Sequence, residues 1–318
     1  MNFVVSSTEL LGHLLAVGRV ISSKNTLPIL DNFLFTIEND ELTITASDLE
    51  TTFMSKMKLD NVTGAGKIAI EAKRLTNTLK EFPEQPLTFN INDDTLAIDI
   101  LSENGKFSVV GQKGEDFPQL PSLVEEKKST INLTSELLLH GITKTIFATA
   151  DDELRPVMNG IFIELGEDNI TFVASDAHKL VRYRRTDAKT ENPSSFILPQ
   201  KPASLLKNVL LREEDPVILE FDEKNAFFQF DDYKLVCGLV EGNYPNYDSV
   251  IPTKNPNKLT IGRTELLNTI KRVSVFSNQA SNLIKLQLAG NQITLSAQDI
   301  DFSISAYERI NCQYQGDE

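Results

Sequence analysis

The 318-residue chain is too long for one ordinary hydrophobic core, so its length predicts two or three domains. Apolar residues make up 41% and charged residues 24%, which is typical of a folded globular protein and excludes a disordered one. The formal charge of −14 argues at face value against a nucleic-acid partner, because phosphate binding is driven by basic side chains.

Targeting features are also missing from the sequence. No apolar run approaches the roughly 18 residues that a membrane-spanning helix needs. Residues 1–5 lack the basic and apolar regions of a secretory signal. The two cysteines, Cys237 and Cys312, cannot form a disulfide framework. We therefore expect a cytoplasmic protein with no membrane partner.

Three segments along the chain open in the same way. Residues 7–11, 134–138 and 263–267 each end in Glu-Leu-Leu and begin a helix-compatible stretch. In the first two, a Ser or Thr just before the Glu supplies N-cap chemistry. The glutamates are 127 and 129 residues apart, which indicates a repeated unit.

A second marker has the same period. Residues 42–48, 170–176 and 293–299 alternate apolar and polar side chains, as a half-buried strand does, and each run ends in Asp. These aspartates are 128 and 123 residues apart. Two independent markers at one period predict three tandem repeats.

The first two repeats contain a second strand-and-helix half, and both close with an aromatic-Pro pair at 117–118 and 244–245. Each complete repeat is therefore expected to be an α+β domain built from antiparallel sheets and two helices. The predicted second-half segments are 67–70, 72–82, 87–91, 95–101 and 106–110 in the first repeat, and 196–198, 202–211, 217–221, 226–230 and 234–239 in the second.

The third repeat is expected to be incomplete. The repeat period places its end near ~370, so about fifty residues are expected to be missing after the strand predicted at 302–311. The sequence leaves open whether this is a truncated chain or a shortened natural product. The predicted domains are 1–123, 127–248 and 257–318, joined by polar or Pro-containing linkers at 121–130 and 252–258.

The sequence offers no constellation for catalysis. It lacks a P-loop, a dinucleotide-binding glycine motif, a nucleophile elbow and a zinc-protease motif. His13, His140 and His178 are far apart, and none has metal-ligand spacing with a cysteine. We therefore expect a protein that is not an enzyme and that holds no metal or cofactor.

Two acidic features have both a functional and a structural interpretation. The Asp-Asp-Glu run at 151–153 could bind a metal, but a solvated turn is favoured because charge runs are usually exposed. Asp48, Asp176 and Asp299 could form a catalytic set. Residues repeated at a domain period more often hold equivalent turns, and Asp does so by accepting hydrogen bonds from its own backbone.

The predicted helices differ in charge from the rest of the chain. Together they contain twelve basic and six acidic residues, a surplus of six positive charges, which leaves −20 on the remainder. If the helices face one way, one surface is basic although the protein is acidic, and a polyanion responds to that local field. Alternatively, Lys and Arg simply accumulate on exposed helix faces. The stretches counted are 8–25, 72–82, 135–149, 200–214 and 263–272.

Five motifs, spread in order over the whole chain, resemble the bacterial DNA polymerase III beta subunit family, the sliding clamps. They are Asn-Thr-Leu-Pro-Ile-Leu at 25–30, Ala-Ser-Asp-Leu-Glu at 46–50, Asp-Phe-Pro at 116–118, Val-Ala-Ser-Asp-Ala-His-Lys-Leu at 173–180 and Glu-Gly-Asn-Tyr-Pro-Asn-Tyr at 241–247. The resemblance implies a head-to-tail homodimer that closes a ring of six similar domains, with sheets outside and helices inside, around duplex DNA.

The resemblance also implies a set of cations that face the DNA. Such a ring needs no base-specific contacts, since encirclement holds the duplex and weak phosphate contacts permit sliding. Lys24, Arg155 and Lys201 match the family's positions best. The full set is Lys24, Lys73, Arg74, Lys80, Arg155, Lys201, Lys207 and Arg272.

A partner pocket between the second and third domains is the family's other site. It takes short linear motifs from DNA polymerases, repair proteins and the clamp loader, and small and aliphatic groups beside a proline suit an apolar peptide. Ala177 replaces the family's usual Gly, Ser249 stands where Arg is common, and the segment that completes the pocket is expected beyond Glu318. The matching residues are Met158, Ser175, Ala177, His178, Leu180, Pro245, Ser249 and Val250.

The implied dimer interface joins the first domain of one subunit to the third domain of the other. Phe107 and Val109 are expected on one side, with the helical pair Val275 and Phe276 on the other. We therefore predict a non-catalytic processivity factor for DNA replication. The alternative is a repeat scaffold that binds proteins through an inter-domain groove and does not bind DNA.

Overall fold

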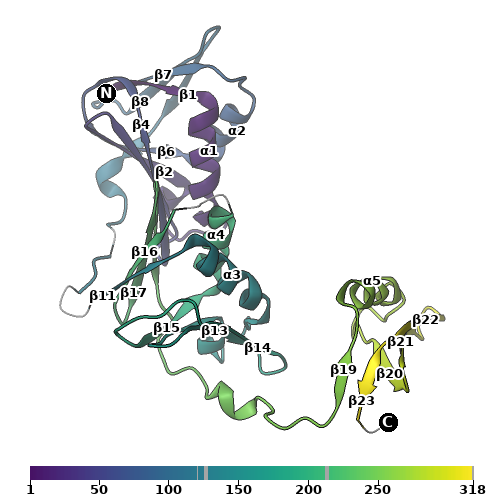
Figure 1. Ribbon diagram of the computed structural model, residues 1–318. Coiled ribbons are helices and arrows are strands. Elements are labelled where there is room, and N and C mark those ends of the chain that lie inside the picture. Colours follow the sequence, from purple (N-terminus) through teal and green to yellow (C-terminus); the bar gives the residue numbers. More distant parts are fainter. Residues whose placement is uncertain (120, 125–127, 212–214, 317–318) are drawn as a thin grey trace. The chain divides into compact units, whose positions relative to one another are not determined.

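The computed structural model describes residues 1–119, 121–124, 128–211 and 215–316. The chain forms two compact units, Met1–Pro245 and Asn246–Glu318, so the first unit holds two repeats and the second holds the third (Figure 1). Within the described ranges, no helix has the length and apolar character needed to cross a bilayer. The predicted linker residues 125–127 and helix residues 212–214 lie outside the described residues.

The first repeat is an α+β domain with two helices, as its pattern predicts. Its first helix is capped by Ser6, whose Oγ accepts a hydrogen bond from the Glu9 backbone N–H at 3.5 Å, so the predicted cap next to Glu9 is wrong. Ser7 instead donates to the Pro83 carbonyl at 2.8 Å. The elements are β1 (Asn2–Ser6), α1 (Ser7–Val17), β2 (Asn32–Glu38), β3 (Glu41–Ser47), β4 (Thr51–Lys58), β5 (Asp60–Thr63), β6 (Gly66–Glu71), α2 (Ala72–Lys80), β7 (Pro86–Ile91), β8 (Ala97–Leu101), β9 (Lys106–Val110) and β10 (Gln112–Lys113).

The second repeat follows the same order of elements, except that its described residues contain no counterpart of β5 or β10. Thr134 caps its first helix by accepting a hydrogen bond from the Leu137 backbone N–H at 3.2 Å. The elements are β11 (Ser129–Leu133), α3 (Ser135–Thr145), β12 (Gly160–Leu165), β13 (Ile170–Ser175), β14 (Leu180–Arg185), β15 (Ser194–Pro199), α4 (Gln200–Leu210), β16 (Val217–Phe221), β17 (Asn225–Phe230) and β18 (Tyr233–Gly238).

One nine-stranded sheet runs through both repeats of the first unit. Its order is β10-β6-β2-β3-β4-β18-β17-β16-β11, and β4 and β18 pair antiparallel across the repeat boundary, with Phe53 opposite Leu235. Two further sheets, β5-β1-β7-β8-β9 and β14-β13-β12-β15, complete the unit. The helices pack on one side of the nine-stranded sheet: α1 contacts β3 and β4, and α4 contacts β18 (Figure 1).

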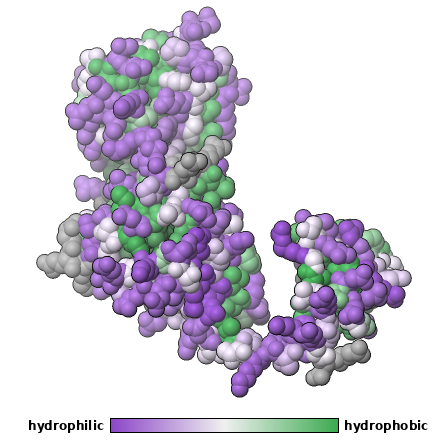
Figure 2. Space-filling model, viewed as in Figure 1, coloured by the Kyte–Doolittle hydropathy of each residue, from purple (hydrophilic) through white to green (hydrophobic). Residues whose placement is uncertain are grey.

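A single hydrophobic core extends over both repeats of the first unit. Phe3, Phe35 and Phe89 from the first repeat and Phe172 and Phe228 from the second are fully buried members of the same cluster. The visible surface is mostly hydrophilic, with hydrophobic residues in limited patches (Figure 2). Burial of large apolar side chains explains why two sequence repeats fold as one unit.

Two predicted helices end earlier than expected. α1 stops at Val17 instead of continuing to residue 25, and α3 stops at Thr145 instead of 149; a 3-10 turn follows each. Gly18 follows α1 directly, and Ile21-Ser22-Ser23 comes after the 3-10 turn; glycine, β-branched and hydroxyl residues are all poor in a helix interior. Lys24 therefore lies in a loop and not on a helix.

The second unit has its own small core. It consists of β19 (Lys258–Thr260), α5 (Arg263–Ser274), β20 (Lys285–Ala289), β21 (Gln292–Asp299), β22 (Ile304–Asn311) and β23 (Gln313–Gln315). Val273 of α5 packs with Ile293 and Leu295 of β21. The sheets are β20-β21-β22 and β19-β23, so the described part of this unit contains the first half of the repeat pattern.

Candidate functional site

The repeated aspartates hold turns. Asp48 Oδ1 accepts hydrogen bonds from the backbone N–H groups of Glu50 and Thr51, at 3.1 and 2.7 Å. Asp176 and Asp299 do the same with the residues two and three positions after them. The structural interpretation of these aspartates is confirmed.

The acidic run 151–153 also forms a turn. Asp152 accepts hydrogen bonds from the Leu154 backbone N–H at 2.9 Å and from Arg155 Nε at 2.8 Å. These bonds lower the pKa of Asp152 below its ordinary value. In the described ranges, no cluster of three His, Cys, Asp or Glu side chains could hold a metal ion.

The cations proposed to face DNA come from helices and from loops beside them. Lys73, Arg74 and Lys80 lie on α2, Lys201 and Lys207 on α4, and Arg272 on α5. Lys24 follows α1, and Arg155 precedes the 3-10 turn Pro156–Met158. All eight are exposed to solvent except Lys207, which is half-buried.

Four of these cations bind carboxylates. Arg74 pairs with Glu71 at 2.9 Å, Arg155 with Asp152 at 2.8 Å, and Lys201 with Asp48. Arg272 forms a forked pair with Glu308, Nε to Oε2 at 3.0 Å and Nη2 to Oε1 at 2.5 Å, and this pair lowers the pKa of Glu308. Exposed ion pairs contribute little to stability, so Arg74, Arg155 and Arg272 can exchange their carboxylates for phosphate.

The other four proposed cations have no carboxylate partner in the described part of the chain. They are Lys24, Lys73, Lys80 and Lys207. The positive charge of an ammonium group without a protein partner is not neutralised by a nearby carboxylate, so the group can attract phosphate. These lysines are the stronger candidates for contacts with a polyanion.

Lys201 has a structural position that the sequence did not reveal. Its Nζ donates to the Val20 carbonyl at 2.7 Å and to the Asp48 carboxylate, and both acceptors belong to the first repeat. Asp48 is the more buried partner, with 11% of its side chain exposed against 42% for Lys201. Lys201 therefore ties α4 of the second repeat to the first.

Arg19 is a cation that the sequence analysis counted but did not select. It lines a groove of about 460 Å³ between α1 and α2, together with Lys73 and the apolar residues Leu15 and Ile21. Its position in the first predicted helical stretch was the only feature of the sequence that pointed to Arg19 as a candidate. The groove joins two cations to an apolar floor on the helix side of the unit.

Six of the residues proposed for the partner pocket lie in the first unit. Met158 and Leu180 are half-buried, Ser175 is buried, and Ala177, His178 and Pro245 are exposed. The Ser175 Oγ organises the turn after β13: it accepts from the Ala177 N–H at 3.1 Å and donates to the Lys179 carbonyl at 2.9 Å. Ser249 and Val250 lie in the second unit, on the 3-10 turn Tyr247–Val250.

Ala177 has a left-handed backbone, with φ at 73°. Leu49, the equivalent residue of the first repeat, has φ at 79°. A side chain is disfavoured in this region and glycine is not, which gives the physical reason for the Gly that the family usually has here.

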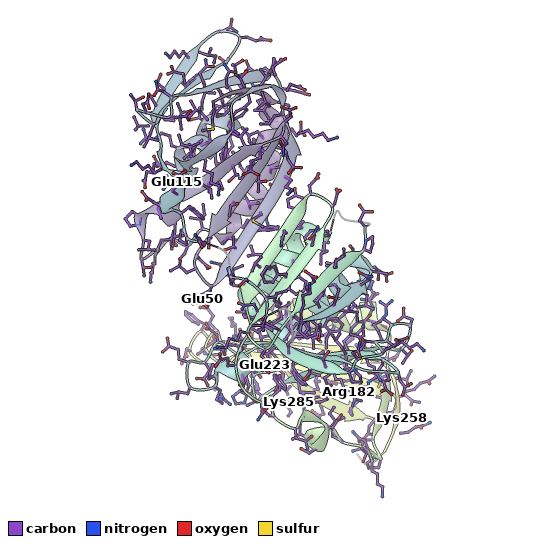
Figure 3. The ribbon with its side chains drawn as sticks, turned by 90° about the vertical axis from the view of Figure 1, so that its left-hand side faces the viewer. Glu50, Glu115, Arg182, Glu223, Lys258 and Lys285 are labelled. Atoms are coloured by element: carbon purple, nitrogen blue, oxygen red, sulfur yellow. The ribbon has the colours of Figure 1, made fainter. Side chains whose placement is uncertain are left out.

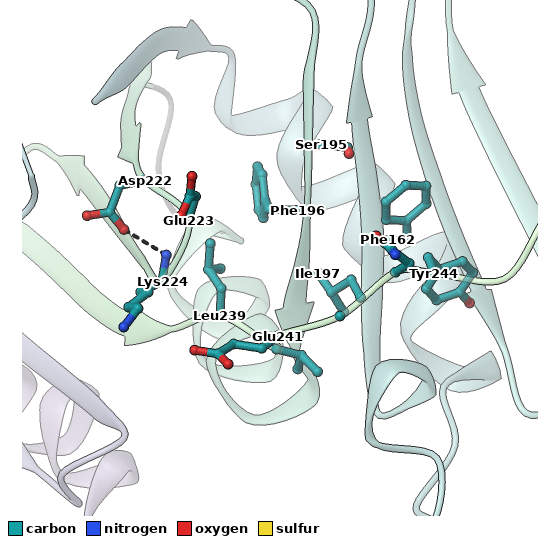
Figure 4. A pocket seen from close by; sticks show the side chains of 13 residues that line it. Phe162, Ser195, Phe196, Ile197, Asp222, Glu223, Lys224, Leu239, Glu241 and Tyr244 are labelled. Atoms are coloured by element: carbon teal, nitrogen blue, oxygen red, sulfur yellow. Dashed lines mark hydrogen bonds between the residues drawn. The ribbon is translucent and has the colours of Figure 1, made fainter. Parts of the chain in front are cut away.

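The Tyr244-Pro245 segment is held against the second repeat. The ring of Tyr244 stacks on Phe162 of β12 with 4.8 Å between centroids and 2° between planes. Burial raises the pKa of the Tyr244 hydroxyl to about 12. An adjacent cavity of about 590 Å³ is lined by Phe162, Phe196 and the acidic Glu223 and Glu241 (Figure 4).

The residues proposed for the dimer interface are accessible. Phe107 is 40% exposed and packs edge-on against Phe82 at 5.1 Å, and Val109 is half-buried. Val275 and Phe276 are exposed but follow α5, which ends at Ser274, so their predicted helical position is wrong. Val273, Val275 and Phe276 are β-branched or aromatic, and such side chains weaken a helix end.

Residues 1–121 match the N-terminal domain of the DNA polymerase III beta subunit family, 132–246 its central domain and 248–318 its C-terminal domain. Two relatives named "Beta sliding clamp" come from Synechocystis sp. (30% identical, 94% of this chain and 82% of that protein) and Pseudomonas putida (28%, 99% and 85%). The crystal structure of a DnaN sliding clamp from Bartonella birtlesii bound to griselimycin has a TM-score of 0.91 at 26% identity, covering 100% of this chain and 85% of that one.

Proposed function

Since this chain belongs to the DNA polymerase III beta subunit family and is a DNA sliding clamp, we propose that two copies close head to tail around duplex DNA. As a sliding clamp it is a non-catalytic processivity factor, and its partners are DNA and DNA polymerase. Two copies bring six repeats together. Chromosome replication in the cytoplasm is the setting that we propose for it.

The observation that carries the ring proposal is the pairing of β4 with β18. It joins one repeat to the next by an antiparallel ladder from Tyr233 opposite Ser55 to Cys237 opposite Thr51. β9 of the first repeat corresponds to β18, and β22 of the third repeat corresponds to β4. In the described ranges, each of them is the edge strand of its sheet. A second copy can supply the missing partner strand to each.

The cations are proposed to hold the duplex loosely. Lys24, Lys73, Lys80 and Lys207, with Arg19 added from the structure, are the main phosphate contacts in this proposal, and the carboxylate-paired cations are secondary. Phosphate contacts carry no sequence information, so such a lining favours sliding over stopping at a site. Lys201 has a second role in this account, because it also joins the first two repeats.

The surface formed by Met158, Leu180 and Pro245 is proposed to take short apolar motifs of the polymerase, of repair proteins and of the clamp loader. Aliphatic side chains beside a proline suit an apolar anchor. A fluorescent peptide with one aliphatic and one aromatic anchor tests this by anisotropy. We expect Leu180→Asp to abolish binding and the exposed Lys189→Asp to leave it unchanged; equal affinity for both variants would contradict a peptide site at this surface.

Encirclement is tested by retention on DNA. The protein is loaded onto a nicked circular plasmid by the clamp loader of the same organism and then washed in high salt. We expect it to stay on the circle and to leave once the plasmid is linearised, because only a ring is held without strong contacts. Equal retention on both forms would favour direct binding, and no retention on either would favour a scaffold that does not bind DNA.

A further inference from the structure

We propose that the cavity of about 590 Å³ beside β15 binds a short, extended peptide segment through an arginine side chain. The cavity lies within the first unit. None of its lining residues belongs to the surface formed by Met158, Leu180 and Pro245 or to the cations proposed for DNA. Binding there requires neither the ring nor DNA, so it is a separate interaction of the same molecule.

One wall of the cavity is the open edge of β15. In the described ranges β15 pairs with β12 alone and is an end strand of its sheet. The Ile197 carbonyl points away from β12, because it accepts a hydrogen bond from the Val240 N–H at 3.1 Å. Backbone groups two residues apart point to the same side of a strand, so the N–H and carbonyl of Ser195 face outward beside the cavity. An extended chain along this edge can therefore bond to Ser195.

The turn between β16 and β17 forms a second wall. Asp222 Oδ1 accepts hydrogen bonds from the Lys224 and Asn225 N–H groups, both at 2.8 Å. Asp222 Oδ2 accepts from the Val124 N–H at 3.0 Å. These bonds hold the turn, so Asp222 has a structural role. The carboxylate that the turn exposes to solvent belongs to Glu223 (Figures 3 and 4).

The segment that follows β18 forms the third wall. Its Leu239 N–H donates to the Lys224 carbonyl at 2.7 Å, and at its other end Tyr244 stacks on Phe162. The segment is thus fixed at both ends and carries Glu241 at the cavity (Figure 4). Walls that are already in place lower the entropic cost of binding.

The charge of the cavity favours a basic side chain. Its lining contains three carboxylates, those of Asp222, Glu223 and Glu241, and one ammonium group, that of Lys224, which leaves two net negative charges. Glu241 is exposed and has no hydrogen-bond or ion-pair partner in the part of the chain that the structure describes. A cation brought to this rim is attracted, and an acidic peptide is repelled.

Apolar side chains form the inner part of the cavity and favour arginine among the basic residues. Phe196 lines it and is buried against Phe221, with 4.8 Å between ring centroids, and Leu239 lies beside it (Figure 4). The methylene groups of an arginine can pack on this surface while its guanidinium stays at the wet rim. Five N–H donors on one planar group can bond two carboxylates at once, which a lysine does less well.

Fluorescence anisotropy with a labelled peptide and the full chain tests the site. The probe is Gly-Ser-Val-Arg-Val-Ser-Gly, in which the valines favour an extended backbone. The control peptide has citrulline, a neutral isostere, in place of arginine. We expect the citrulline peptide to bind at least about tenfold more weakly, and the arginine peptide to lose affinity between about 50 and about 300 mM NaCl. Equal affinities, or no binding of either peptide, would overturn the proposal.

Substitutions on the rim locate the bound peptide. Glu223 and Glu241 are exposed, so changing them should leave the fold intact. We expect Glu223→Gln and Glu241→Gln each to weaken binding of the arginine peptide about threefold, and the double variant to weaken it about tenfold. Glu103→Gln makes the same charge change at an exposed position of the first repeat and should have no effect. Unchanged binding in the double variant would place the peptide elsewhere.

N-methylated peptides test the hydrogen bonding to β15. Methylating every second backbone amide removes the N–H donors from one edge of an extended peptide and leaves the other edge intact. We expect one methylation pattern to weaken binding at least about fivefold and the other to have little effect, because only one edge faces Ser195. Equal effects of the two patterns would overturn the extended mode. If argininamide competes as strongly as the whole peptide, the cavity takes a small cation and the assignment to a peptide is wrong.

Discussion

Lys201 Nζ, on the first turn of α4, donates a hydrogen bond to the carboxylate of Asp48 in the other repeat. The same ammonium also donates to the Val20 carbonyl, so a single side chain satisfies two acceptors across the boundary. Nearby, the Gly238 N–H donates to the Glu50 carbonyl at 3.0 Å, and Glu50 marks this junction in Figure 3. A cation proposed for DNA is therefore also part of the link between two repeats.

Removing this cation should destabilise the first unit. We expect Lys201→Ala to lower the free energy of unfolding by about 1–2 kcal/mol, because the partly buried Asp48 loses a charged donor. Lys207→Ala, which removes a cation of the same helix that has no carboxylate partner in the described chain, should change it by less than about 0.5 kcal/mol. Urea denaturation followed by circular dichroism measures both. Similar effects for the two variants would show that the link does not matter to stability.

Replacing Ala177 by glycine should stabilise the protein. Its φ of 73° costs a residue with a side chain about 1 kcal/mol, and glycine avoids that cost at the expense of some unfolded-state entropy. We expect Ala177→Gly to raise the free energy of unfolding by about 0.5 kcal/mol.

The opposite change provides the control for that experiment. Gly242 has φ at 123°, and a Cβ there would lie 2.8 Å from Val157 Cγ1, so Gly242→Ala should destabilise by more than about 1 kcal/mol. A destabilising Ala177→Gly would mean that its side chain makes contacts worth more than the backbone strain.

Stability should fall in acid partly through Asp176. Hydrogen bonds from the Lys179 ammonium, and from the backbone N–H groups of Lys179 and His178, hold the pKa of this carboxyl well below its usual range. A lowered folded-state pKa stabilises the fold above the unfolded-state value, and that contribution is lost as pH falls through the folded-state value. The loss therefore begins below about pH 4.

The comparison that checks this is Asp176→Asn against the parent in thermal melts from pH 7 to pH 2. We expect the parent to be more stable at pH 7 and the difference to shrink below about pH 4. Asp151→Asn changes a carboxylate with no hydrogen-bond partner in the described chain and should show no such convergence. A difference that stays constant down to pH 2 would contradict the assignment.

The lysines with no carboxylate partner among the described residues should determine the salt dependence of DNA binding. Each phosphate contact that is removed should lower the slope of log affinity against log salt by about 0.9. We expect this for Lys73→Ala, Lys80→Ala and Lys207→Ala, measured by anisotropy on a short duplex. Lys113→Ala, on β10 at the edge of the nine-stranded sheet, should leave the slope unchanged. An equal effect from Lys113→Ala would mean that binding is not confined to the helix side.

Local sequence determined much of the fold because its causes are local. The alternation at 42–48 predicted β3, and the helix-compatible stretch that opens at 263–267 predicted α5, since both depend only on neighbouring side chains. The Asx turns at Asp48, Asp176 and Asp299 could be predicted for the same reason. Helix ends were less predictable: α1 gives way to the 3-10 turn Gly18–Val20, well before the expected end at residue 25.

The repeat period and the family motifs were thus readable from the sequence by itself, and so was the expectation of a non-catalytic clamp. The tertiary structure decided that β4 and β18 join two repeats into one sheet and that Lys201 reaches Asp48 across that boundary. It also decided that Phe107 lies at an open edge and that four of the eight proposed cations are tied to carboxylates. Such relationships join residues as far apart as Thr51 and Cys237, 186 positions, and no local propensity encodes which distant strand or side chain becomes a neighbour.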